Sequence, residues 1–170
     1  QVVGGKVLNV TTAGTGSVDV DGAAITAVTV TGGSGGVAIN NLGGAAGTTL
    51  AEGETLTKVT LTGVDGNSAL SGDALLDVTV GGSTTGARTI TINNDQATAG
   101  HDLKVTAAGT GYQADGTTQA QTVVTDTNAK QIDLAVTGKS SIDLTNNSAM
   151  KTLNVTGDAA SIVSADMAIL

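Results

Sequence analysis

The chain has no cysteine, proline, tryptophan or phenylalanine, and its 170 residues include one tyrosine and one histidine. The absence of cysteine excludes disulfide bonds and thiolate metal sites. Without large aromatic side chains, the chain cannot fill the thick core of a conventional sandwich or α/β domain. The apolar residues that are present, chiefly Val, Ile, Ala and Leu, fit a narrow interior such as that of a stacked repeat protein.

Basic residues are also scarce, since seven Lys and Arg stand against fifteen Asp and Glu, for a formal net charge of −8. Such a chain repels phosphate backbones and anionic lipids, which argues against nucleic-acid binding. The sequence has no run of about 18 apolar residues and no opening signal region, so we expect neither membrane insertion nor a Sec signal in it. It begins at Gln1 rather than Met, and we expect a processed or excised piece of a longer protein.

One phrase recurs along the chain, in which an apolar residue and two spacers precede Val or Leu alternating with Thr, and a glycine closes the phrase. Period-2 alternation of this kind predicts strands with Val and Ile inward and Thr outward. The closing glycines suit tight corners because glycine adopts positive φ without steric cost. Copies of the phrase lie at 7–14, 25–32, 56–63, 75–82, 102–109, 131–138 and 150–157.

A second strand ends in Asn-Asn at three places, each 53 residues after the last: Asn40-Asn41, Asn93-Asn94 and Asn146-Asn147. Each pair lies between two copies of the phrase, which defines a three-strand unit. We predict an all-β, parallel β-solenoid built from this unit, as a single segment over 1–170 with internal units at about 25–63, 75–109 and 131–157. With about 20 to 25 residues in a coil, the chain forms about seven coils, and the Asn pairs do not stack directly on one another.

Calcium is a candidate cofactor, because acidic and amide residues cluster in three predicted turn regions. Ca²⁺ takes six to eight oxygen ligands, and each cluster supplies only a few of them. Asp and Asn in turns also hydrogen-bond their own backbone, which is the alternative role for the same residues. The candidate ligands are Asp19 with Asp21, then Asp65, Asn67 and Asp73, and finally Asp95 with Asp102.

The Asn pairs and the single tyrosine are candidates for interactions. The Asn residues are interpreted first as turn residues, with side-chain ladders and amide contacts to sugars as alternatives. Tyr112 lies in an insertion at 108–128 and could anchor a neighbouring subunit or loop.

Catalysis is not expected from this composition. His101 is the only histidine, so no multi-histidine metal site and no catalytic triad can be named. Lys104 and Tyr112 could serve a polysaccharide lyase, but the single arginine, Arg88, provides little charge to neutralise a uronate. Thr-x-Thr pairs such as Thr29 with Thr31 resemble ice-binding arrays, although β-propensity explains them equally well.

The Gly-, Thr-, Ala- and Val-rich chain, with phrases such as MKTLNVTG, VTLTGVDGNSALSG and SIDLTNN, resembles the repetitive regions of bacterial surface-layer proteins and related RTX-type secreted proteins. The resemblance covers essentially the whole chain. It implies a Ca²⁺-supported β-solenoid, type I export and assembly on the bacterial cell surface. The family's Ca²⁺ nonapeptide is absent, because Val37 stands where that motif requires Asp, so no ligand is carried over from it.

We therefore expect a structural, self-assembling extracellular protein, and not an enzyme. Its partners would be copies of itself or neighbouring coils of the parent chain. The alternative is an adhesin or glycan-binding module that contacts cell-surface polysaccharide. A polysaccharide-acting β-helix enzyme and an ice-binding solenoid rank below both.

Overall fold

The computed structural model describes residues 6–21, 25–41, 55–82, 88–95, 100–109, 121–138, 140–157 and 161–165. Every regular element among them is a β-strand. The described part of the chain accordingly contains no helix of the length and apolar character that a bilayer crossing needs.

The strands form two seven-stranded sheets, and all neighbouring strands within each sheet run parallel. Sheet A contains, in spatial order, β1 (Val7–Thr11), β3 (Ala27–Thr31), β5 (Lys58–Thr62), β7 (Asp77–Gly81), β9 (His101–Ala108), β11 (Ala129–Thr137) and β13 (Thr152–Gly157). Sheet B contains β2 (Val18–Asp21), β4 (Val37–Asn41), β6 (Ser68–Gly72), β8 (Thr89–Asn94), β10 (Gln121–Thr125), β12 (Ser141–Leu144) and β14 (Ile162–Ala165).

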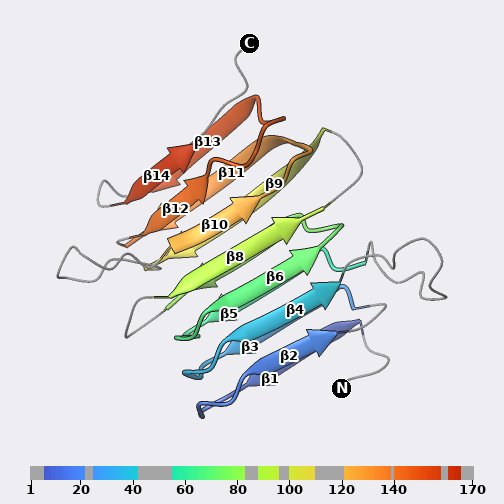
Figure 1. Ribbon diagram of the computed structural model, residues 1–170, viewed down its shortest axis with the longest axis vertical. Helices are drawn as coiled ribbons and strands as arrows, with labels where there is room; N and C mark the ends of the chain where they lie inside the picture. The colour runs from blue at the N-terminus through green and yellow to red at the C-terminus, as the bar shows by residue number, and fades with distance from the viewer. Residues whose placement is uncertain are drawn as a thin grey trace.

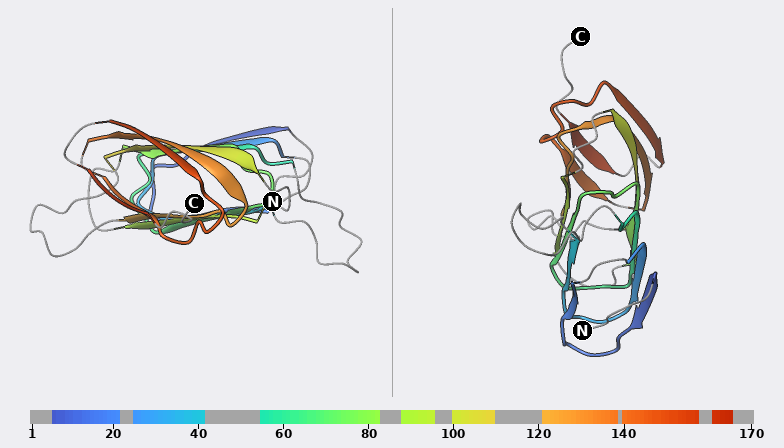
Figure 2. Two further views of the ribbon diagram at one scale, coloured as in Figure 1. Left: turned by 90° about the horizontal axis from the view of Figure 1, so that it is seen from above. Right: turned by 90° about the vertical axis from the view of Figure 1, so that its right-hand side faces the viewer.

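Consecutive strands alternate between the two sheets, which face each other across a narrow interior (Figures 1 and 2). We call an odd-numbered strand together with the even-numbered strand that follows it a tier. Seven tiers stack from the N-terminal tier, β1 and β2, to the C-terminal tier, β13 and β14. The prediction of an all-β, parallel, repetitive architecture is confirmed.

The three-strand unit is incomplete. Each predicted unit covers an odd strand, the even strand that ends near Asn-Asn and the next odd strand, but a further sheet B strand then follows: β6, β10 or β14. The repeating unit thus has four strands and two tiers. The fourth strand escaped sequence analysis because it lacks both the Asn pair and the closing phrase; β6 reads SALSG.

The core consists of columns of Val, Leu and Ile that run through the tiers. In sheet A, Val28, Val59, Val78 and Val105 occupy one register position on four successive strands, and all are buried. Thr29, Thr60 and Thr79, one residue along, point to the outer face. Val and Ile therefore point inward and Thr outward, as the alternation predicts.

The closing glycines mark the corner where the chain leaves sheet A. Positive φ occurs at this position from the second to the sixth tier, for example at Gly63 (φ 66°), and the backbone ladder continues through it, since Gly63 N donates to Gly81 O at 2.8 Å. In the seventh tier Gly157 lies within β13, opposite Val136. The first phrase differs, because Thr12 rather than Gly14 takes this position. Thr12 N donates to Thr31 O at 2.9 Å, while Gly14 lies two residues further along.

Candidate functional site

Apolar side chains are left uncovered on the two end tiers. Val7 of β1 is 60% exposed, Val155 of β13 is 51% exposed and Ile162 of β14 is 40% exposed, while in a middle tier Leu76, directly before β7, is 43% exposed. Val155 points inward, whereas Val7 and Ile162 lie on the outer faces of their strands. Inward residues of the end tiers such as Val10 and Val155 keep exposed surface, while their register partners Val30 and Leu134 are almost completely buried. The interior of the stack is thus closed in the middle and open at both ends.

The end strands also have an unpaired edge. Among the described strands, β1 pairs with β3 alone and β2 with β4 alone, while β13 pairs with β11 alone and β14 with β12 alone. A free edge presents a row of N–H and C=O groups that can pair with another strand. Free edges and partly exposed inward residues coincide at the same two tiers.

A column of polar residues follows the corner at the end of sheet B. Asn41 lies beside Gly72, which lies beside Asn94. Asn94 Nδ2 donates to Asp126 Oδ2 at 2.7 Å, and Asp126 N donates to Asn147 Oδ1 at 2.7 Å. The three Asn pairs are therefore two tiers apart, with Gly72 and Asp126 between them, which confirms that they do not stack directly.

The second asparagine of each pair holds the backbone together at this corner. Asn94 Oδ1 accepts from Leu75 N at 3.0 Å, and its Nδ2 donates to Leu75 O at 3.0 Å. Asn147 Nδ2 donates to Val124 O at 2.8 Å and to Leu144 O at 2.7 Å. Asn94 and Asn147 are only 2% and 0% exposed, so their amides are used inside the protein. Asn41, which is also buried, accepts from Leu56 N at 3.1 Å.

Asp126 is the centre of a buried polar network that sequence analysis missed. Its Oδ2 accepts from Asn94 and lies 2.7 Å from His101 Nε2, and its Oδ1 accepts from Asn128 N at 3.2 Å and Ala129 N at 2.9 Å. The signal that could have found it is its place directly after the strand QTVVT, as Asn41 and Asn94 end their strands. This network joins neighbouring tiers and leaves Asp126 with no exposed surface.

Arg88, the residue directly before β8, is also buried, with only 2% of its surface exposed. None of its three side-chain nitrogens has a hydrogen-bond partner in the part of the chain that the structure describes. Burial lowers the pKa of Arg88 below its usual value, and attraction to Asp65 partly opposes that shift. The guanidinium group is thus held in the interior at a cost in stability.

The outer face of sheet A carries columns of threonine and alternating charge. Thr29, Thr60, Thr79 and Thr106 share one register position on four successive strands. Two residues earlier, the column reads Lys58, Asp77, Lys104 and Asp133, and Lys58 Nζ lies 2.9 Å from Asp77 Oδ2. Lys104, considered above for a lyase, therefore stands between two aspartates in a cross-strand charge ladder.

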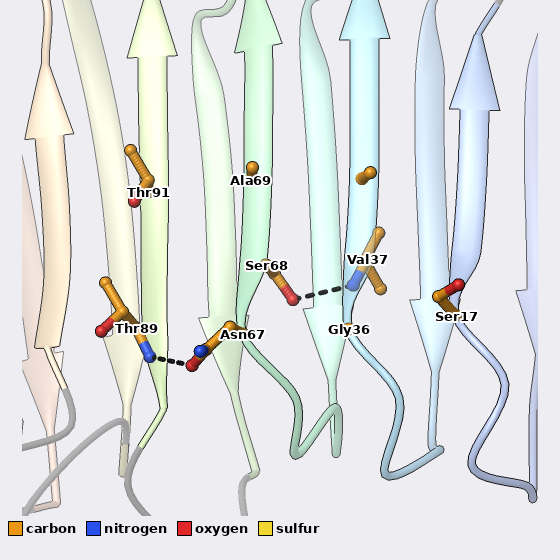
Figure 3. Close-up of a pocket in the computed structure, with 9 residues that line it drawn as sticks. Ser17, Gly36, Val37, Asn67, Ser68, Ala69, Thr89 and Thr91 are labelled. Carbon is orange, nitrogen blue, oxygen red and sulfur yellow. Dashed lines mark hydrogen bonds between the residues drawn. The ribbon is translucent and has the colours of Figure 1, made fainter.

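An open groove of about 560 Å³ lies on the outer face of sheet B (Figure 3). Two hydrogen bonds join tiers along it: Val37 N donates to Ser68 Oγ at 3.1 Å, and Thr89 N donates to Asn67 Oδ1 at 2.8 Å. No charged residue lines the groove, so its chemistry suits a neutral polar ligand. The lining residues are Ser17, Gly36, Val37, Ala38, Asn67, Ser68, Ala69, Thr89 and Thr91.

The candidate calcium ligands are spread over several tiers. Asp65 and Asn67 precede β6 while Asp73 follows it, so the five-residue strand separates them. Asp19 and Asp21 lie on β2 in register with Ala38 and Asn40, and Asp102 lies on β9 beside Gln131. Asp95 follows β8, and its N donates to Gly72 O at 2.7 Å. Within the described ranges, no three His, Asp or Glu side chains lie close enough together to hold a metal ion.

The other predicted interaction residues have different positions. Asn40 and Asn146, the first residues of their pairs, are exposed, and Asn93 is partly buried. Tyr112 and most of the 108–128 insertion lie outside the described residues.

Comparisons of the chain with models of protein families, with curated proteins and with solved structures find no match.

Proposed function

We propose that the seven tiers are coils of a parallel β-solenoid, and that the chain is a structural, self-assembling component of a bacterial cell surface. The uncovered apolar residues on the open end tiers carry this proposal. Covering a half-exposed valine such as Val155 stabilises by about 1 kcal/mol, and pairing of the free strand edges adds hydrogen bonds. The partner is a second copy of the chain or neighbouring coils of a longer one.

The extracellular location rests on the sequence. The resemblance to surface-layer and RTX-type proteins supports it, as do the formal net charge of −8 and the absence of cysteine in a protein exposed to oxidants. Calcium enters the proposal through that resemblance alone.

Assembly is tested by negative-stain electron microscopy and sedimentation of the purified chain, with and without Ca²⁺. We expect filaments or sheets. Val155→Lys places a charge on the open end and should abolish them, whereas Thr79→Lys, on the outer face of a middle tier, should not. Monodisperse particles of folded wild-type protein under every condition would contradict the proposal.

The location is tested separately by labelling intact cells of the source organism with antibodies against the chain. Surface labelling that protease treatment of intact cells removes is the expected result. Labelling only after the cells are permeabilised would show that the protein is not on the surface.

The groove on sheet B favours a second candidate function, the binding of a neutral glycan. Its polar hydroxyl and amide groups are arranged along four tiers on a rigid face. The test is binding to an array of neutral oligosaccharides. Ala69→Tyr, which fills the groove, should abolish binding, whereas Thr60→Tyr on the opposite sheet should leave it unchanged; equal binding by both variants would place the ligand elsewhere.

A further inference from the structure

The two open ends differ in the size of their inward residues. On the N-terminal tier, these residues are large: Leu8 and Val10 of β1, and Val18 and Val20 of β2. On the C-terminal tier, the inward residues are Leu153, Val155 and Gly157 of β13 and Val163 and Ala165 of β14, so each strand carries one small inward residue. The two ends are therefore not equivalent.

We propose that the C-terminal tier of one molecule docks onto the N-terminal tier of a second copy, with β13 parallel to β1 and β14 parallel to β2. This inference rests on the proposed self-assembly and specifies its polarity and register. Side chains alternate between the two faces of a strand, so a register error of one residue would turn the apolar residues outward. Continuing the columns of the stack places Val155 opposite Leu8 and Val163 opposite Val18.

The sizes of the side chains fit this arrangement. In the same register, Gly157 lies opposite Val10 and Ala165 lies opposite Val20, so a large residue meets a small one at two inward positions.

Charge and strand direction favour the same polarity. Asp19, which is exposed on the outer face of β2, meets the hydroxyl of Ser164. A two-fold axis that joined β2 to its own copy would place Asp19 near its symmetry mate, with repulsion between like charges. Such an axis would also make the joining strands antiparallel, whereas all neighbouring strands within the molecule are parallel.

A further shift of two residues is disfavoured because the sheets run in opposite directions, as the arrowheads in Figure 3 show. Moving one copy by two residues along sheet A moves it by two residues the other way along sheet B. Because β2 and β14 have four residues each, such a shift would leave only about half of each strand paired with the other. A head-to-tail contact of this kind does not close on itself, so it produces a filament.

The absence of cysteine allows a direct test with engineered disulfides. In the proposed register, Thr156 lies opposite Asn9 on exposed positions of β13 and β1. Neighbouring strands lie about 4.8 Å apart, within the Cα separation of about 4.4–6.8 Å that a disulfide spans. The double variant Asn9→Cys, Thr156→Cys should give a ladder of dimers, trimers and larger species on a non-reducing gel after copper-catalysed oxidation by air.

The single variants distinguish the polarity. Neither Asn9→Cys nor Thr156→Cys alone should form a disulfide, whereas an equal mixture of the two should form dimers and nothing larger. Efficient dimerisation of either single variant would indicate a two-fold contact and overturn the inference.

A second pair tests the register. Asn9→Cys with Asn154→Cys is two residues out of register, which puts the Cα atoms about 8 Å apart and beyond the reach of a disulfide. Crosslinking of this pair in preference to the first would overturn the proposed register. If filaments form but the first pair does not crosslink, the head-to-tail register is refuted and the proposed self-assembly stands. If the folded protein forms neither filaments nor crosslinks, the proposed self-assembly is refuted as well.

Discussion

Replacing Arg88 by methionine should stabilise the protein. The side chain is 2% exposed, and none of its three nitrogens has a hydrogen-bond partner in the described structure. An unsatisfied buried polar group costs about 1–3 kcal/mol, and more when it is charged. Methionine keeps most of the apolar stem and adapts to irregular space.

The expected gain is the desolvation cost less two losses. Methionine is shorter, so a small void of about 1 kcal/mol offsets part of the gain. The attraction between Arg88 and Asp65 also disappears. We expect a net increase of about 1–2 kcal/mol in the free energy of unfolding, and a melting temperature raised by about 2–4 °C for each kcal/mol.

The assay is urea unfolding followed by far-UV circular dichroism, because the chain has no tryptophan. The midpoint should rise at an unchanged m-value, which would show that the native stability and not the denatured state has changed. Arg88→Lys is the matched control, since it keeps a charge at the same position and should bring no gain. If Arg88→Met lowers the free energy of unfolding by more than about 1 kcal/mol while Arg88→Lys resembles wild type, the guanidinium group has a partner and the reasoning fails.

Three further substitutions test the corner column and the outer face by thermal melting. Asn147→Ala removes three hydrogen bonds at a fully buried position and should lower the free energy of unfolding by about 1–3 kcal/mol. Asn146→Ala, at the exposed neighbouring residue, should change it by less than about 0.5 kcal/mol. Equal effects of the two substitutions would contradict the role of Asn147 at the corner. Asp126→Ala leaves four donors without their acceptor and should cost about 3–5 kcal/mol, so a loss below about 1 kcal/mol would argue against the network. Lys58→Ala breaks a largely exposed pair with Asp77 and should cost less than about 1 kcal/mol, an effect that should shrink further in high salt.

The sequence predicts sheet A well because its strands repeat one pattern. All seven copies of the phrase fall on the seven strands of sheet A, and the strands before Asn-Asn correspond to β4, β8 and β12. Each of these strands needs two or three inward apolar residues to fill a narrow interior, so alternation is visible in every copy. In sheet A, the residues that the core requires are thus the same residues that make the strands recognisable in the sequence.

The remaining sheet B strands carry a weaker signal for a physical reason. On β6, the inward positions are Ser68, Leu70 and Gly72, so only one of them is a large apolar residue. Its place in the sheet is secured by the ladders to β4 and β8 on either side. A strand held by its neighbours can lose the alternation from which sequence analysis recognises it.

The contacts within the buried network could not be predicted because its members meet only through the stacking of tiers. His101 and Asp126 are 25 residues apart in sequence, and Asn94 is 32 residues from Asp126. A lone histidine and an aspartate in a turn have many roles open to them, and their contact depends on the length of the loops between strands. The candidate calcium ligands illustrate the converse, since Asp65 and Asp73 are close in sequence but lie on either side of β6.

The constant spacing of 53 residues follows from the corner column. Its members Asn41, Gly72, Asn94, Asp126 and Asn147 are separated by steps of 31, 22, 32 and 21 residues, so a long tier alternates with a short one and two tiers together take 53. Loops outside the sheets absorb the difference in length, because strand register is set by the inward columns. The corner residues must still meet from tier to tier, since buried amides need their partners. The sequence repeat is therefore a pair of tiers, one long and one short, and a buried asparagine returns at the same corner after each pair.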